Sequence, residues 1–360
     1  MTQEKLDYTT YLPEEKIYEV FRHLDEKSQS SLALTKKMFG HSIFQQDRIK
    51  TKLSEYIETD NLKMVVELLR IRPDLGSLTD HYLNSKQVEL FKLAGFAEQD
   101  KMKIILESNP EFLYTYAPLK DISNIYPIIN KENCEGITVF QHGVWTGNVR
   151  YMCNMILDCL PKIKNGEKIR VELERQYKEL MDYGVVYELD GKRCVEKQFS
   201  LQSLLDGLSQ YVTNYQGWTS EERKLHWCKD VGLPQSLLPA HFRHHYCDPE
   251  TSFWYSSGCT KTKLIRSLTF HNYVEDERQL WDDSLAGLGS NFAITSSDRW
   301  DSAFSSARDQ TPVMAAEKDL LALAAICEVR TKNDLPALIK RLQSPVQSPE
   351  EDRERLCVLP

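Results

Sequence analysis

Residue types that can bind zinc or transfer protons gather in one stretch of the C-terminal half. Seven histidines and cysteines lie between positions 226 and 259: His226, Cys228, His241, His244, His245, Cys247 and Cys259. Structural zinc sites use four such ligands, usually as two closely spaced pairs. The spacings of His241 to His244 and of His245 to Cys247 fit that arrangement only loosely. We therefore expect no metal and favour ordinary buried or solvated histidines; if zinc binds, the candidate ligands are His241, His244, His245 and Cys247.

The same stretch also holds the residue types of a cysteine nucleophile with a histidine base. Cys228 or Cys247 beside His241 would suit covalent catalysis, but this chemistry requires a geometry that residue type alone does not establish. An alternative therefore remains open, in which residues 164–342 form an enzyme domain of unfamiliar type that uses these side chains with or without zinc. The pair Gly287 and Gly289 lacks a preceding strand and predicts a turn, not a phosphate-binding loop. We name no catalytic residue, expect no cofactor, and favour a binding protein over an enzyme.

Composition and charge favour protein partners. The 360 residues carry a net charge of −8, whereas binding to a nucleic-acid backbone requires clustered lysines and arginines. The nine cysteines are scattered, as is typical of a reducing compartment. The first residues lack the apolar core of a signal peptide, and no apolar run approaches the roughly 20 residues that span a bilayer. We expect a soluble monomer that binds no nucleic acid and does not cross a membrane.

The elements that position the C-terminal residues are mostly helices. Apolar side chains at helical spacing predict helices over 164–181, 201–212, 315–329 and 334–342, and the aromatic stretch 215–227 is expected to pack against the second of these. Asp190 and Gly191 stand between alternating apolar residues, which predicts a β-hairpin over Val185–Val195. The expected fold class is mainly α, with an α+β C-terminal domain that contains at least one hairpin.

The N-terminal segment contains two short amphipathic helices by its pattern. Leu12 and Pro13 precede an acidic pair and then an apolar stripe at helical spacing, formed by Ile17, Val20, Phe21 and Leu24. Helices this short are marginal without tertiary contacts, so they need a partner to cover their apolar sides. A second stripe includes Leu32, Leu34 and Phe39.

Over residues 9–46 this pattern resembles the F-box, although Ser28 and Gln29 stand where that family usually has an acidic and an apolar residue. The resemblance implies binding to the Skp adaptor protein of SCF-type ubiquitin ligases. It assigns the contacts to Leu12, Pro13, Ile17, Val20, Phe21 and Leu24.

A degenerate repeat follows between residues 50 and 162. Val65, Leu68 and Pro73 recur thirty-seven positions later as Met102, Ile105 and Pro110, and Cys153, Ile156 and Pro161 form a third copy. Each copy predicts a helix that stops before a proline. Gly136–Gly143, followed by Gly147 and Asn148, resembles the ankyrin unit, with Val139 and Gln141 in place of its proline and histidine. The resemblance implies stacked, ankyrin-like helical pairs that present a surface to a partner protein.

The tail from residue 344 is rich in Pro, Ser and Glu and is expected to be disordered. Its acidic residues, followed by Leu356, Val358 and Leu359, resemble the C-terminal signals of effectors that intracellular bacteria inject into host cells through Dot/Icm type IV secretion. Cys357 has the outline of a prenylation site, but the terminal Pro360 departs from it, and we expect no lipid there.

These observations predict four segments: 9–46 F-box-like, 50–162 ankyrin-like, 163–343 a mostly helical C-terminal domain, and 344–360 a disordered tail. The expected protein is an interaction adaptor and a bacterial effector in the host cytoplasm. It would link an unknown target to an SCF-type ligase through the Skp adaptor.

Overall fold

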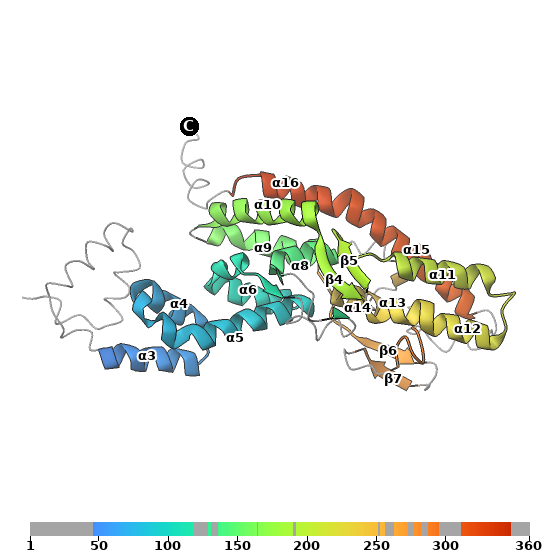
Figure 1. Cartoon of the computed structure of the whole chain (residues 1–360), viewed down its shortest axis with the longest axis horizontal. Helices are drawn as coiled ribbons and strands as arrows, with labels where there is room; N and C mark the ends of the chain where they lie inside the picture. Colours follow the sequence, from blue (N-terminus) through green and yellow to red (C-terminus); the bar gives the residue numbers. More distant parts are fainter. Residues whose placement is uncertain are drawn as a thin grey trace, which may run out of the picture. The chain divides into compact units, whose positions relative to one another are not determined.

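The computed structural model describes residues 46–118, 129–130, 136–163, 165–189, 192–250, 253–255, 263–272, 277–281, 287–294 and 311–346. This part of the chain is mainly helical, as expected (Figure 1). The chain divides into two compact units, residues 1–79 and residues 80–360. The residues predicted to bind the Skp adaptor lie outside the described residues, and so does most of the predicted tail: Leu12, Pro13, Ile17, Val20, Phe21, Leu24 and 347–360.

In the first unit, α3 (Gln46–Glu58) packs against α4 (Leu62–Ile71), which is followed by the 3₁₀ turn η2 (Pro73–Leu75). Helix α4 is capped by Asn61, whose side chain accepts a hydrogen bond from the backbone amide of Met64. Its apolar stripe, which includes Val65 and Leu68, is buried. Pro73 then prevents the helix from continuing.

The second unit contains a helical part and a mixed part. Helix α5 (Gly76–Gly95) leads into the first of these, which comprises α6 (Gln99–Ser108), η3 (Pro110–Tyr114), α8 (Val139–Thr146), η4 (Val149–Cys153), α9 (Asn154–Cys159), η5 (Leu160–Lys162) and α10 (Gly166–Tyr183). The helices of the mixed part are α11 (Gln202–Asn214), α12 (Ser220–His226), η6 (Trp227–Gly232), α13 (Leu233–Ser236), α14 (Ala240–Tyr246), η7 (Phe253–Tyr255), α15 (Thr311–Val329), η10 (Arg330–Asp334) and α16 (Leu335–Gln343). Helix α16 returns along α10 and joins the two parts (Figure 1).

All strands of the described residues are short and antiparallel. The predicted hairpin is confirmed: β4 (Val185–Leu189) pairs with β5 (Lys192–Glu196), with Val186 opposite Val195. Strand β2 (Ile129–Asn130) extends this hairpin to three strands. Strand β6 (Thr269–Asn272) forms a second hairpin with β7 (Glu277–Leu280). Strand β1 (Ala117–Pro118) pairs with β3 (Gly136–Ile137).

The three copies of the degenerate repeat share one local structure. Each is a helix whose apolar stripe is buried, followed by a 3₁₀ turn that begins at or beside the proline: α4 with η2, α6 with η3, and α9 with η5. Within the second unit, α6 packs against α9. The helix and stop signals of the repeat are thus confirmed, while its assignment to the ankyrin family stays a prediction.

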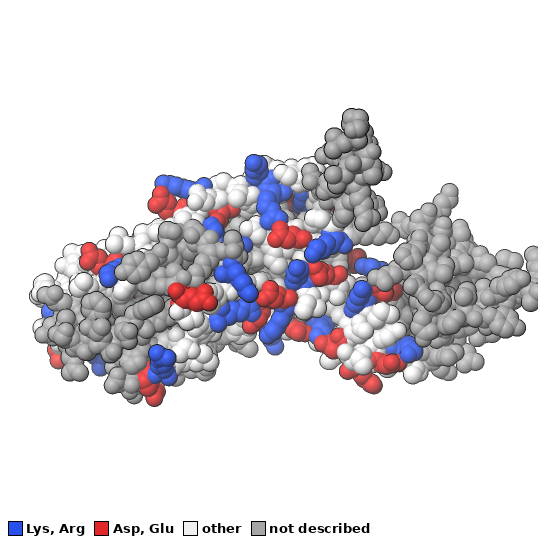
Figure 2. All heavy atoms as spheres, turned by 180° about the vertical axis from the view of Figure 1, so that it is seen from behind, with Lys and Arg blue, Asp and Glu red and all other residues white. Residues whose placement is uncertain are grey.

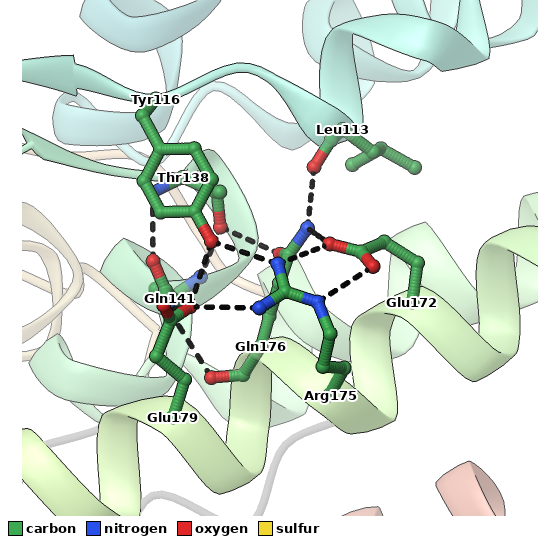
Figure 3. A network of polar contacts seen from close by, with 8 residues as sticks. All are labelled: Leu113, Tyr116, Thr138, Gln141, Glu172, Arg175, Gln176 and Glu179. Atoms are coloured by element: carbon green, nitrogen blue, oxygen red, sulfur yellow. Dashed lines mark hydrogen bonds and ion pairs between the residues drawn. The ribbon is translucent and has the colours of Figure 1, made fainter.

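A buried polar network fixes α8 against α10 (Figure 3). Thr138 and Gln141 form a capping box at the start of α8, so the glutamine that departs from the ankyrin pattern here caps the helix. Gln176 of α10 accepts a hydrogen bond from Thr138 Oγ1 at 2.7 Å and donates one to the carbonyl oxygen of Leu113 at 2.8 Å. At the rim, Arg175 pairs with Glu172 at 2.7 Å. The network positions α8 and its C-terminal turn.

The core of the mixed part lies between α11, α14, α15 and the β6–β7 hairpin. It includes Leu204, Leu208, Phe242, Trp281 and Leu323, all buried. The predicted packing of the aromatic stretch against α11 is confirmed, since the rings of Tyr211 and Trp227 lie 4.7 Å apart. No helix among the described residues is both long and apolar enough to span a bilayer. On the face drawn in Figure 2, Lys and Arg side chains are interspersed with Asp and Glu.

Candidate functional site

A small cavity of about 20 Å³, lined by both charged and apolar residues, lies in the second unit where α8, η4, α14, α15 and η10 meet. It is lined by Gly147, Arg150, Tyr151, His241, Phe242, His245, Ile326, Arg330 and Asp334. A cavity of this size admits a water molecule or one small charged group, whereas pockets for cofactors and drug-sized ligands run to roughly 300 to 1,000 Å³. The arrangement therefore suits the recognition of a single group.

The wall from α8 and η4 depends on the turn between them. Gly147 ends α8 with φ of 79°, a left-handed conformation that favours glycine. A Cβ atom at this position would overlap the guanidinium of Arg330, so the glycine also makes room for that side chain. The segment η4 that follows is a π-helix, a rare form that occurs frequently at functional sites, and it carries Arg150 and Tyr151.

The wall from α14 presents His241 and His245, which share one side of the helix because they are four residues apart. The Tyr151 hydroxyl lies 3.4 Å from Nε2 of His245. His241 is only 4% exposed, and its Nδ1 is buried with no hydrogen-bond partner within the part of the chain that the structure describes. Buried polar atoms are normally paired, so this nitrogen requires an explanation.

The third wall is η10, which is a π-helix like η4 and supplies Arg330 and Asp334. Asp334 forms an ion pair with Arg150 at 2.7 Å. Arg330 is 7% exposed; its Nη1 donates to the carbonyl oxygen of Phe199 at 3.4 Å, and its guanidinium lies 5.8 Å from the ring centroid of Phe242. Nη2 of Arg330 is buried and makes no hydrogen bond to any described residue.

The electrostatics of the cavity are positive. Two arginines and one aspartate line it, so one positive charge is left over when both histidines are neutral. Burial, followed by the nearby His245 and Arg330, holds the pKa of His241 well below the usual 6.5. Burial also lowers the pKa of Arg330. Both effects mean that adding a proton inside this cavity is unfavourable while it holds no anion.

The His/Cys cluster predicted from the sequence is divided in the structure. His241 and His245 line the cavity, whereas Nδ1 of His244 lies 3.2 Å from the carbonyl oxygen of Ser267, and Cys247 is part of the apolar core. His226 is held elsewhere, with Nε2 2.8 Å from the carbonyl oxygen of Gly207 and Nδ1 2.9 Å from Asp230. Cys259 lies outside the described residues. Within the described ranges, no three His, Cys, Asp or Glu side chains converge as metal ligands.

The cysteine nucleophile of the alternative interpretation gains no support from these positions. Burial raises the pKa of the Cys228 thiol, which disfavours the reactive thiolate. The residues that sequence reasoning missed are Arg150, Tyr151, Arg330 and Asp334. Arg150 and Asp334 are 184 positions apart, so no local pattern could have paired them.

Comparisons with known proteins place most of the cavity inside a recognised sequence domain. Residues 203–342 match a family model described as the CBUA0006 C-terminal domain. This family match covers less than half of the chain. An uncharacterized protein, CBUA0006 of Coxiella burnetii (strain RSA 493 / Nine Mile phase I), is 29% identical over 284 residues, which is 74% of this chain and 76% of that protein. Neither description mentions an F-box or an ankyrin repeat. No solved structure matches the chain.

The family match runs from α11 to α16 and therefore includes His241, His245, Arg330 and Asp334. Gly147, Arg150 and Tyr151 precede it. The cavity thus forms where the matched domain packs on the helical part that comes before it.

Proposed function

We propose that the protein is an interaction adaptor whose segment 9–46 binds the Skp adaptor of an SCF-type ubiquitin ligase, while the remainder binds a target protein. The observation that carries this proposal is the sequence pattern at the N-terminus. Leu12 and Pro13 are followed by the apolar stripe Ile17, Val20, Phe21 and Leu24, as in the F-box. Such a stripe on short helices requires a covering surface.

Two further observations support the proposal. The repeat copies that follow the segment are helix and turn units, of the kind that serve as binding scaffolds in repeat proteins. The similar protein comes from a bacterium, which is compatible with a bacterial effector that acts in a host cell. The target protein and the route of delivery to the host cytoplasm are parts of the same proposal.

The test is isothermal titration of the full chain with purified Skp adaptor protein. The double variant Leu12→Ala with Pro13→Ala is expected to bind at least tenfold more weakly, because truncating a fully buried leucine at an interface removes roughly 1.5 to 3 kcal/mol. A matched control is Leu335→Ala with Pro336→Ala, the same change at the start of α16, where Leu335 is partly buried and Pro336 is exposed.

The control variant is expected to bind as the wild type does. Equal affinities for all three proteins would place the contact elsewhere than at Leu12 and Pro13. A wild-type chain that gives no heat of binding at Skp adaptor concentrations well above those typical of such interfaces would refute the proposal.

A further inference from the structure

The cavity between α8, η4, α14 and η10 holds two buried donors that no described residue satisfies. These are Nη2 of Arg330 and Nδ1 of His241, which donates in one of its two tautomers. Both side chains are more than nine-tenths buried, and both line the cavity. The donors come from different elements, η10 and α14, and so approach the cavity from two walls.

Leaving these groups unsatisfied is costly. An unpaired buried polar group disfavours folding, and an uncompensated buried charge disfavours it more strongly. Asp334 does not compensate Arg330 fully, because its carboxylate already pairs with Arg150 at 2.7 Å. Gly147 leaves room for the guanidinium of Arg330 at this buried position. An anion in the cavity would explain why a cation is buried there.

We propose that this cavity binds a small oxyanion, either free phosphate or the terminal phosphate of a small molecule, through Arg330 and His241. The guanidinium supplies a charge-assisted hydrogen bond to one oxygen and the imidazole N–H supplies a hydrogen bond to another. The small volume limits the buried part of the ligand to one such group. The ion pair of Arg150 and Asp334, both partly buried, lines the same cavity.

Binding of the anion also changes the protonation of the cavity. The groups that face His241 are His244 and His245 on its own helix, Arg330 on η10 and His142 on α8. The positive charge among them opposes protonation of His241 in the empty site. A bound anion offsets that charge, so the pKa of His241 rises on binding.

The experiment uses the full chain at constant ionic strength, with sodium chloride exchanged for inorganic phosphate or for glycerol 3-phosphate. Phosphate is expected to raise the melting temperature in a saturable way, by about 4 °C at a concentration on the order of 100 times Kd. Arg330→Met is expected to remove this rise. Arg341→Met is the matched control, because Arg341 pairs with Asn154 and Asp158 away from the cavity, and it is expected to retain the rise.

A second measurement keeps the test independent of the variants. NMR of the wild-type chain with labelled histidines is expected to show one imidazole whose pKa rises when phosphate is added. Saturation by inorganic phosphate alone identifies the free ion as the ligand, and saturation by both compounds identifies a terminal phosphate group; either result supports the site. The proposal is overturned if neither compound changes the melting temperature or a histidine resonance, or if Arg330→Met responds as the wild type does.

Discussion

Replacing Gly207 by alanine is expected to destabilise the second unit by about 3 kcal/mol. Gly207 lies within α11, where alanine would ordinarily stabilise a helix by roughly 0.5 to 1 kcal/mol. At this position, however, the new Cβ atom would overlap the carbonyl oxygen of Asp230 and lie 2.7 Å from its carbonyl carbon. Overpacking against a rigid neighbour costs typically about 1 to 3 kcal/mol, and here the neighbour is backbone.

The backbone of η6 has little freedom to yield. Val231 is fully buried beside the contact, and His226 holds the same region through its hydrogen bond with the Gly207 carbonyl oxygen at 2.8 Å. The steric overlap between α11 and η6 therefore outweighs the gain in helix propensity. A destabilised variant indicates that the steric overlap dominates, whereas a stabilised variant would indicate that helix propensity dominates.

Urea unfolding followed by tryptophan fluorescence measures this effect, because all six tryptophans lie between residues 145 and 300, in the second unit. The matched control is Gly217→Ala, where the Cβ atom would lie 3.6 Å from the carbonyl oxygen of Asn214, an ordinary contact. The control is expected to change the free energy of unfolding by less than about 1 kcal/mol. Equal effects of the two substitutions would mean that α11 and η6 are not in close contact.

Acidification is expected to destabilise the second unit through His142. Burial lowers the pKa of this imidazole from 6.5 to about 4 in the folded state. Below pH 6.5 the unfolded chain binds a proton that the folded chain does not, so the stability is fully present above pH 6.5 and is lost as the pH falls toward 4. Between pH 7 and pH 5 the loss from this one group is about 2 kcal/mol.

The check is the difference in free energy of unfolding between pH 7 and pH 5 for the wild type and for His142→Gln. The variant cannot bind the proton, so its difference is expected to be smaller by about 2 kcal/mol, whatever its absolute stability. His81→Gln, at an exposed position of α5, serves as the control and is expected to keep the wild-type difference. A wild-type difference that His142→Gln leaves unchanged would assign the pH dependence to other groups, with His241 the next candidate.

Local signals in the sequence were sufficient for much of the fold. The Asp190–Gly191 pair marked the β4–β5 hairpin, and the apolar spacing marked α10, α11, α15 and α16 to within a few residues. Prolines at 73, 110 and 161 marked the helix ends of the repeat copies. These features depend on interactions between residues close in the chain, which one sequence reveals.

Features that depend on distant contacts were not predicted. Strand β2 exists because Ile129 and Asn130 pair with β4 some sixty residues later. The β6–β7 hairpin carries no Asn-Gly or Asp-Gly signal. The cavity combines Arg150 and Tyr151 with Arg330 and Asp334, and only His241 and His245 among its residues stood out by type. Arg330 became a candidate only because its Nη2 is buried without a hydrogen bond to any described residue, and a sequence does not reveal burial or hydrogen bonding.

The proposed role of the N-terminal segment in ligase recruitment is tested most directly by the mass of the complex. Size-exclusion chromatography with light scattering, on an equimolar mixture of the full chain and the Skp adaptor, measures that mass. We expect one peak whose mass is the sum of one 41.8 kDa chain and one Skp adaptor. Two separate peaks, with the chain eluting at its own mass, would contradict it.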